Sequence, residues 1–536
     1  LIAMLTWLIA YPIVLVTRDA FAGPLGWTLD YVRAFFGRPN EWQAFWGSLW
    51  ISLATVALSA LIGIPLAFLF SRFEFPGRRI LGALVALPVA LPPLVGVVAF
   101  LFLYGETGFV AHLYDAVTGA PMAPWRLEGP WAILLVQAYS MYAYFYLLTR
   151  AALDRMDGAA GEAAASLGAS TWRTLTRVTL PILRPALTGA ALLTFTTALA
   201  SFSAPYIFGG GYRVLPTQIL ATRLNGDYQL SMVETVALTL LALVALGLST
   251  RTGREVVTSG GKGSAPARLA TGRTGILVAI LGWSFTGFLL LPHATLLLLS
   301  FVPVATWTTQ ALPPVYTAAN YVTLVHDPVR LLPLLNSLWM AVAATAASVA
   351  VALIAGVLIV RRKVPGRGAI EALLAAPWAV PGTVFALALA TAFSVHRPWA
   401  ARMILVGTIW ILPLAYLIRN LPLTSRATLS GFRQLDPALD EAAASLGASR
   451  WVTWRRVLLP LLRPALMAGA ALAFVTALGD FVTSILLYTY DTRPISLEIL
   501  SSLRDGDIGV AAVYGVALMI AGGAVFLLGS ERNATA

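Results

Sequence analysis

About twelve apolar segments, most of them eighteen residues or longer, recur along this 536-residue chain and limit its fold more than any other feature. A helix of that length crosses a hydrocarbon core of about 30 Å. The segments lack the alternating pattern of outer-membrane strands, and backbone groups in lipid must bond internally. The sequence therefore predicts an all-α integral membrane protein with about twelve transmembrane helices. We place these helices at residues 1–17, 47–70, 80–104, 130–149, 183–208, 232–249, 274–302, 336–360, 370–394, 401–418, 464–488 and 509–529.

The few charged residues, 11% of the chain, are unevenly placed and give a net charge of +12. The basic residues do not cluster with aromatic residues as in a nucleic-acid-binding surface, so we expect membrane lipid and no nucleic acid as a partner. They concentrate in alternate loops, which the positive-inside rule places in the cytoplasm. The chain has no cysteine and no group of His, Asp and Glu with metal-ligand spacing, so we expect no metal and no cofactor bound by this chain.

An internal repeat divides the chain into two halves. The peptide EAAASLGAS occurs at residues 162–170 and again, 279 residues later, at 441–449. Upstream, SLW at Ser48 and at Ser337 match, and Pro88 and Pro92 match Pro377 and Pro381, at an offset of 289. Both copies of the nonapeptide follow an even number of spans, which predicts parallel halves related by an axis along the membrane normal. We expect a first half at residues 1–250, a polar linker at 251–273 and a second half at 274–536.

The repeated peptide itself is typical of a thin cytoplasmic helix. Glu162 suits the N-terminal end of a helix, and the alanines after it keep the helix narrow. Gly168 permits either a turn or a close approach of another backbone. Such a helix fits a groove on another protein; the alternative, a helix lying on lipid, does not account for two identical copies.

The spacing within both copies resembles the EAA loop of binding-protein-dependent ABC importer permeases. The pattern continues beyond each glycine, to Val178 and Leu180-Pro181 and to Val457 and Leu459-Pro460. The chain is similar over almost its whole length to the fused, two-half permeases of ferric-iron, thiamine and related importers. The resemblance implies that each EAA helix docks in one ATPase subunit, so that two copies of the ATPase bind. The implied coupling residues are Glu162, Ala163, Ala164, Gly168, Glu441, Ala442, Ala443 and Gly447.

The same resemblance implies a multi-pass protein of the bacterial inner membrane that is not itself an enzyme. Gly260-Gly261-Lys262 is faintly similar to a phosphate-binding loop, but Val256 and Gly263 stand where that motif needs Gly and Ser or Thr. We therefore expect ATP and Mg to bind only to the partner ATPase subunits.

An ionisable residue inside a span indicates a functional site by default. Asp480 is the carboxylate that we place well within a span, and its counterpart in the first half is Ser201. A structural hydrogen bond to a neighbouring helix is the alternative role for Asp480. Tyr206 and Tyr488, near the outer ends, are candidates for cargo contact, although tyrosine also gathers at membrane interfaces. The predicted pathway or gate residues are Ser201, Ser203, Tyr206, Asp480, Thr483 and Tyr488.

The matched outer segments, LPTQILATRLNGD from Leu215 and ISLEILSSLRDGD from Ile495, favour paired docking sites for a substrate-binding protein, with plain loop duplication as the alternative. Among cargoes we favour ferric iron, with thiamine, a polyamine or an aminophosphonate as alternatives. An ion-coupled secondary transporter also has parallel halves, but it has no use for two cytoplasmic docking helices.

Overall fold

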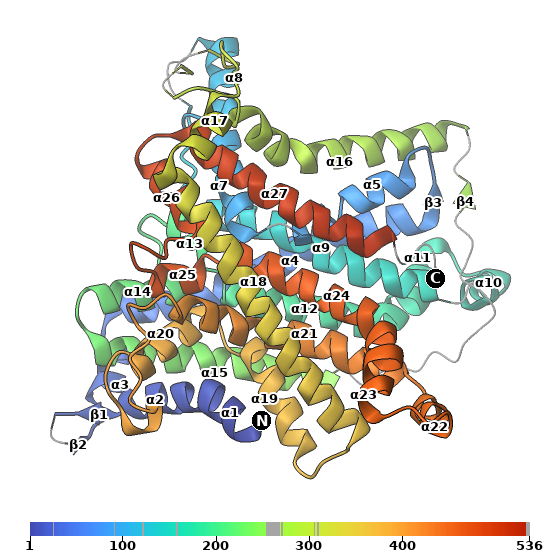
Figure 1. Ribbon diagram of the computed structural model, residues 1–536. Coiled ribbons are helices and arrows are strands. Elements are labelled where there is room, and N and C mark those ends of the chain that lie inside the picture. The colour runs from blue at the N-terminus through green and yellow to red at the C-terminus, as the bar shows by residue number, and fades with distance from the viewer. Residues whose placement is uncertain are drawn as a thin grey trace.

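The computed structural model describes residues 1–531 except for 25, 91, 120–122, 157–158, 253–267, 270–271, 305 and 308–309. Most of the described residues lie in helices, many of which lie side by side in a bundle (Figure 1). In this part of the chain the strands form two sheets of two strands each. The predicted all-α fold is therefore confirmed.

The first half begins with α1 and ends with α15. Its elements are α1 (Ile2–Leu5), η1 (Thr6–Ala10), α2 (Tyr11–Asp19), β1 (Ala22–Gly23), β2 (Gly26–Trp27), α3 (Asp30–Gly37), α4 (Pro39–Arg72), β3 (Phe73–Glu74), α5 (Arg78–Leu84), α6 (Leu87–Ala90), α7 (Pro93–Tyr104), α8 (Phe109–Thr118), α9 (Pro130–Arg155), α10 (Ala159–Ser166), α11 (Thr171–Thr174), η2 (Leu175–Thr179), α12 (Leu180–Leu199), α13 (Ser203–Phe208), α14 (Leu215–Leu224) and α15 (Tyr228–Thr252).

The second half repeats this order, with a shorter segment between α20 and α21 than between α7 and α9. Its elements are β4 (Arg268–Leu269), α16 (Gly272–Leu299), α17 (Ala319–His326), α18 (Pro328–Gly356), η3 (Val357–Arg361), α19 (Arg367–Ala379), α20 (Gly382–Phe393), η4 (Pro398–Ala400), α21 (Ile411–Gln434), α22 (Ala438–Ser445), α23 (Arg450–Thr453), η5 (Trp454–Leu458), α24 (Leu459–Leu478), α25 (Val482–Leu487), α26 (Ile495–Arg504) and α27 (Ile508–Glu531).

Ten helical stretches of the described chain are long and apolar enough to cross a membrane, and the bent pair of α19 and α20 adds an eleventh. The prediction for residues 401–418 was wrong in its bounds, because 401–410 form turns and irregular backbone and α21 begins only at Ile411. Helix α21 packs against α18 as its counterpart α9 packs against α4. With α21 included, the number of crossing segments agrees with the predicted number.

Two predicted spans, 80–104 and 370–394, are not continuous helices. The first is divided into α5, α6 and α7, and the second is bent by 110° between α19 and α20. Pro92 and Pro381, which occupy equivalent positions, are the N-cap residues of the helices that follow the breaks. Proline has no N–H to donate, and its ring clashes with the preceding turn, so a helix cannot continue through it without a kink or break.

The predicted spans 183–208 and 464–488 are also divided. Helix α12 ends at Leu199 and α13 begins at Ser203, whereas α24 ends at Leu478 and α25 begins at Val482. Asp480 therefore lies in a break and not inside a continuous helix, contrary to the prediction. Irregular backbone at membrane depth is tolerated where it is buried in protein or lines a cavity, so these equivalent breaks mark a region of functional interest.

The two halves exchange their first helices. Helices α1 and α2 pack against α19 and α20 of the second half, and α16 packs against α5 and α7 of the first half. The Nε1–H group of Trp7 donates to the carbonyl of Trp399 at 2.8 Å. On α16, His293 is buried with its Nδ1 atom 3.0 Å from the hydroxyl of Tyr139, as expected of a packing histidine. The boundary of the sequence repeat is therefore not the boundary between the packed units.

The predicted linker, 251–273, lies mostly outside the described residues, as does the stretch Gly260-Gly261-Lys262. Within the linker, Arg268–Leu269 form β4, which pairs in parallel with β3 of the first half. This pairing joins the linker to the loop that follows α4.

Candidate functional site

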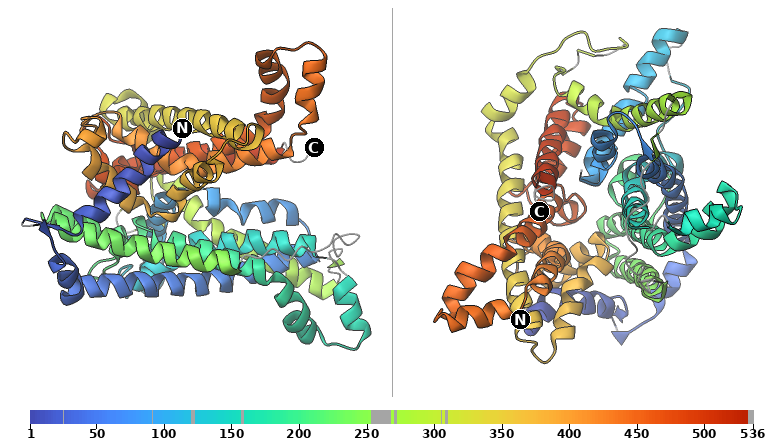
Figure 2. Two further views of the ribbon diagram at one scale, coloured as in Figure 1. Left: turned by 90° about the horizontal axis from the view of Figure 1, so that it is seen from below. Right: turned by 90° about the vertical axis from the view of Figure 1, so that its right-hand side faces the viewer.

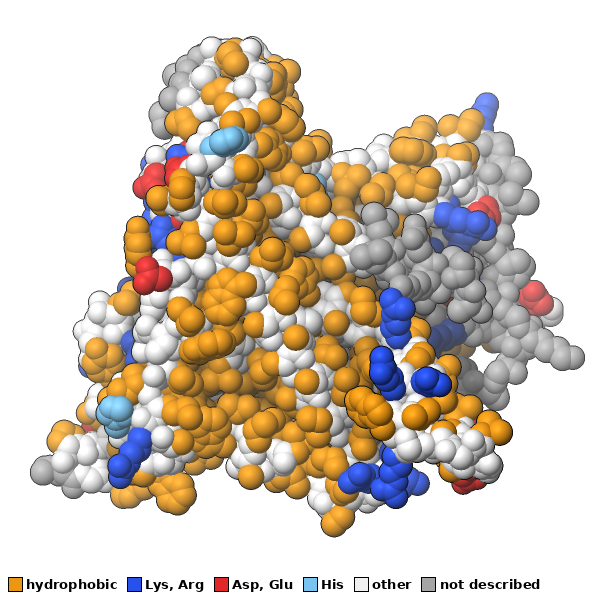
Figure 3. Space-filling view, in the orientation of Figure 1, with side chains coloured by type: hydrophobic (Ala, Val, Ile, Leu, Met, Phe, Trp, Pro, Cys, Tyr) orange, Lys and Arg blue, Asp and Glu red, His pale blue; other side chains and the backbone are white. Residues whose placement is uncertain are grey.

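The two copies of the nonapeptide form helix–turn–helix hairpins, α10 with α11 and α22 with α23, at one end of the molecule. The hairpins project in opposite directions from that end (Figure 2). Lys and Arg side chains gather at the same end near α22 and α23, whereas hydrophobic side chains cover the middle of the visible face (Figure 3). This distribution agrees with the cytoplasmic position that the positive-inside rule assigns to the hairpins.

The turn of each hairpin depends on a glycine in the left-handed region. Gly168 and Gly447 have φ angles of +75° and +77°, and a Cβ atom added at either would meet nothing within 4 Å. The N–H group of Gly168 donates to the carbonyl of Ala165, and that of Gly447 donates to Ala444, each at 2.9 Å. Such a turn satisfies carbonyls at the helix end. The glycines are thus required for the turn and not for a close backbone approach.

The rest of the nonapeptide caps the second helix of each hairpin and forms its exposed tip. Ser170 and Ser449 are the N-cap residues of α11 and α23, and their hydroxyl oxygens accept backbone N–H bonds. At the tips, Leu167 and Leu446 are 89% and 88% exposed. Glu162, Ala163 and Ala164 lie on a helix with no buried residue, and in the second hairpin Ala443 alone of the corresponding positions is buried. Each hairpin tip therefore presents one exposed leucine.

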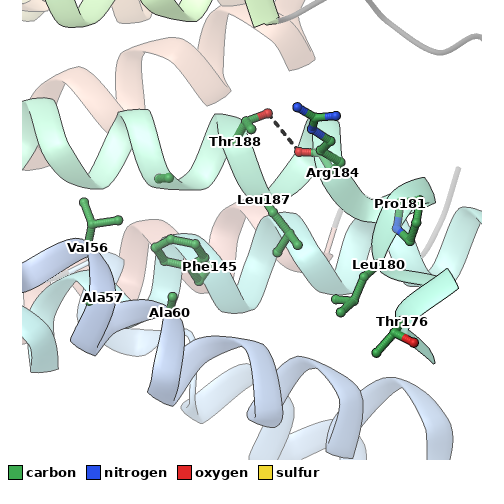
Figure 4. A pocket seen from close by; sticks show the side chains of 11 residues that line it. Val56, Ala57, Ala60, Phe145, Thr176, Leu180, Pro181, Arg184, Leu187 and Thr188 are labelled. Carbon is green, nitrogen blue, oxygen red and sulfur yellow. Dashed lines mark hydrogen bonds between the residues drawn. The ribbon is translucent and has the colours of Figure 1, made fainter. Parts of the chain in front are cut away.

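The two hairpins differ in their supports. In the second half, Asp440 at the start of α22 pairs with Arg361 at 3.1 Å; the counterpart of Asp440 in the first half is Gly161. A groove of about 550 Å³ between α4, α9 and α12, lined by Val56 and Phe145 among others, lies at the base of the first hairpin (Figure 4). The hairpins therefore have the same local fold but different attachment to their halves.

The breaks at the opposite ends of α12 and α24 bring the two halves into contact. Phe202 and Phe481 occupy equivalent positions, 279 residues apart, and their ring centroids are 5.8 Å apart. Both rings are almost completely buried. Two equivalent residues can touch only near the axis that relates the halves. The two rings therefore close the space between the halves at this depth.

Tyr206, a predicted pathway residue, belongs to this closure. Its ring stacks on Phe202 at 5.1 Å and lies 6.0 Å from Phe481. Its hydroxyl oxygen accepts a hydrogen bond at 2.9 Å from Arg504 Nη2 at the end of α26. This bond joins the halves on one side only, because Leu224 stands where Arg504 would be in the first half.

Asp480 is not an isolated charge. Arg419 Nη1 lies 2.5 Å from Asp480 Oδ2, and Asp480 Oδ1 accepts the backbone N–H of Thr483 at 2.8 Å. Arg419 Nη1 also donates to the hydroxyl of Thr483 at 2.9 Å. Asp480 thus lies just before α25, accepts a hydrogen bond from its first turn and is neutralised by Arg419. Sequence reasoning missed Arg419 because we ended the predicted span at residue 418.

The remaining predicted pathway residues are dispersed. Ser201 lies half-buried in the first break, and Ser203 is buried at the start of α13. Tyr488 directly follows α25 and is 43% exposed. The structure therefore brings together Asp480 with Thr483, and Tyr206 with the second break, but it does not form a single cluster from all six residues.

The serine of each SLW peptide bonds to the first residue of an outer helix, α14 or α26. The hydroxyl of Ser48 accepts the backbone N–H of Leu215 at 2.7 Å, and Ser337 accepts that of Ile495 at 2.8 Å. Each serine thus holds the start of an outer helix against the long helix of its half. These helices are largely buried, and their exposed residues are at their tips, at 224–226 and 504–506.

Asp480 is also not the only buried carboxylate, contrary to the prediction. Glu41 in α4 and Glu234 in α15 are buried. Gln218 Nε2 donates to Glu41 Oε1 at 3.0 Å, and the hydroxyl of Thr222 donates to Glu234 Oε1 at 2.6 Å. Glu234 falls within the predicted span 232–249, so a search for acidic residues in every span would have found it.

Comparison with known proteins decides the family. The family described as "binding-protein-dependent transport system inner membrane component" matches residues 59–258 and 348–530, one match in each half. The chain belongs to this family. It is a multi-pass membrane permease subunit of an ABC importer, a class whose members transport and do not catalyse.

Two relatives of this permease align with nearly its whole length. It is 30% identical to a probable ABC transporter permease of Sinorhizobium fredii, over 91% of this chain and 87% of that one. It is 27% identical to the ferric transport system permease of Actinobacillus pleuropneumoniae, over 98% of this chain and 76% of the relative. A shorter match, 32% identical over 39% of this chain and 72% of the relative, is to a sulfate transport system permease of Escherichia coli.

Proposed function

We propose that this permease passes a small solute, with ferric iron as the best-supported cargo, from a binding protein across the bacterial inner membrane by alternating access. The observation that carries the proposal is the pairing of two equivalent cytoplasmic hairpins with a closure, Phe202 against Phe481, between the same two halves. A movement of the hairpins is then transmitted along α12 and α24, which begin beside them and end at the closure.

Two copies of an ATPase subunit are the proposed partners of the hairpins. The support is the equality of the two turns, with glycine φ angles of +75° and +77° and exposed leucines at both tips. Two hairpins with the same turn geometry suit two copies of the same ATPase subunit. ATP and Mg would be held by those subunits, while this chain supplies the docking residues from Glu162 to Gly168 and from Glu441 to Gly447.

Ferric iron is favoured among cargoes because the relative named for ferric transport aligns with 98% of this chain. Asp480 adds no support for a cationic cargo, since Arg419 neutralises its charge. Thiamine, a polyamine and an aminophosphonate stay as alternatives within the same importer class.

Transport in proteoliposomes tests the cargo. We expect the permease, reconstituted with its ATPase and supplied with its binding protein, to accumulate ⁵⁵Fe(III) only when ATP is present. Thiamine, spermidine and 2-aminoethylphosphonate are assayed in parallel. Accumulation of one of these in place of iron would overturn the iron assignment but keep the importer, and ATP-independent exchange would overturn the importer mechanism itself.

The closure between the halves gives a second expected result. Replacing Phe202 and Phe481 together with alanine removes both rings from the axis, so we expect a passive leak of small solutes and faster ATP hydrolysis without binding protein. Phe432→Ala is the matched control, because Phe432 is as deeply buried but packs within the second half only. A tight membrane in the double variant, with normal transport, would show that the closure lies elsewhere.

A further inference from the structure

Helix α21 carries three arginines on one face. Arg419, Arg426 and Arg433 are spaced by seven residues, which is close to two helical turns and about 10 Å along the axis. Leu423 and Ser430, each four residues after an arginine, lie on the same face of the helix. Much of the remainder of α21 is buried against α18, α19 and α24.

Each arginine has a different partner. Arg419 pairs with Asp480, and the outermost of the three toward the cytoplasm, Arg433, pairs with Glu371 at 2.7 Å. Arg426, between them, lies over the ring of Trp378 at 4.2 Å. Within the described residues, no carboxylate lies within ion-pair distance of Arg426. Its positive charge is therefore not neutralised by an acidic neighbour there.

The charge that this face presents is positive. The side chain of Arg419 is 28% exposed, whereas that of Asp480 is 5% exposed, so the cation is the more accessible member of the pair. Arg426 is exposed. An exposed cation at membrane depth is costly against hydrocarbon, and arginines within membrane segments face the interior of a bundle or a water-filled space. The exposed part of this face therefore borders water and not lipid.

The first half has no such face. At the equivalent positions on α9 stand Ser140, Leu147 and Asp154. The three arginines therefore occur at these positions in the second half only, and they are not a property of the repeat. The shared fold of the two halves therefore does not account for these arginines.

We infer that Arg419 and Arg426 line the cytoplasmic part of the passage and favour a cargo that carries negative charge: an oxyanion, or a metal ion held by oxyanion ligands. This inference rests on the proposed importer function, because the face can select a cargo only if the cargo passes along it. A wall of one sign raises the local concentration of ions of the opposite sign. An iron cargo would then cross as an anionic complex and not as a bare cation.

The absence of cysteine from the chain allows a direct test. Cysteine is introduced at Ser430, beside Arg426 on the basic face, and at its exposed counterpart in the first half, Ala151. In the assembled complex, both are treated with sulfonatoethyl methanethiosulfonate, an anion, and with trimethylammonioethyl methanethiosulfonate, a cation, and the rates are normalised to those of free cysteine. We expect the ratio of anion to cation rates to be about fivefold higher at Ser430→Cys than at Ala151→Cys.

Adding Arg426→Gln should bring the ratio at Ser430→Cys down to that at Ala151→Cys. Equal ratios at both sites, or a ratio unchanged by Arg426→Gln, would overturn the inference. So would a thiol at position 430 that reacts only after denaturation, since the face would then not border water. These labelling rates require no cargo, so a failure to accumulate iron would contradict the proposed cargo while leaving the charge preference standing.

Discussion

Replacing Gly168 and Gly447 together with valine should abolish ATP-driven transport while leaving the permease inserted in the membrane. Both residues adopt φ angles near +75°, a conformation that costs a β-branched residue about 1–3 kcal/mol. The helix α10 has no buried residue to hold it in place, so the strain is relieved by opening the turn. The docking helices then lose their shape. The measurements are transport by proteoliposomes and the amount of ATPase that co-purifies.

Gly161→Ala is the matched control for this change. Gly161 also lies in the first hairpin, but its φ angle is ordinary and a Cβ atom there meets nothing within 4 Å. Alanine is the better helix former by about 1 kcal/mol, so the control should transport normally. Either single valine variant should lose less activity than the double variant, since one hairpin stays intact. Normal uptake and normal ATPase binding by the double variant would contradict the docking role.

Asp480→Asn should reduce transport strongly and also lower the stability of the permease in detergent. The change removes the charge that neutralises Arg419 and leaves a partly buried cation. Breaking a buried ion pair from one side typically costs 3–5 kcal/mol, and the partial exposure of Arg419 places the expected loss below about 3 kcal/mol. Thermal unfolding in detergent and transport in proteoliposomes are the two measurements.

A double variant separates the ion pair from a direct role in transport. Asp480→Asn with Arg419→Gln removes both charges, so it should unfold closer to the wild-type temperature than Asp480→Asn alone. If transport recovers with stability, the pair is structural. If stability recovers and transport does not, Arg419 acts on the cargo, as the basic face of α21 predicts. Wild-type stability and transport in Asp480→Asn alone would contradict the importance of the pair.

The sequence by itself determined the class, the repeat and the turns of the two hairpins. Segment length and apolarity decide membrane insertion, and the spacing of EAAASLGAS specifies a local turn in which every hydrogen bond is made within a few residues. Local interactions of this kind do not depend on the rest of the fold. Hence the hairpins at Gly168 and Gly447 have the positions and equivalence that were expected.

Only the tertiary structure decided which distant groups meet. Phe202 faces Phe481, Arg419 neutralises Asp480 and α16 packs against the other half, and none of these contacts follows from the hydropathy of one segment. Hydropathy also does not distinguish a straight span from one divided at Pro92 or Pro381. A carboxylate changes from a lone charge to half of an ion pair through a residue 61 positions away. The physical reason is that burial and charge pairing depend on packing between segments, whereas membrane insertion and helix turns depend on each segment alone.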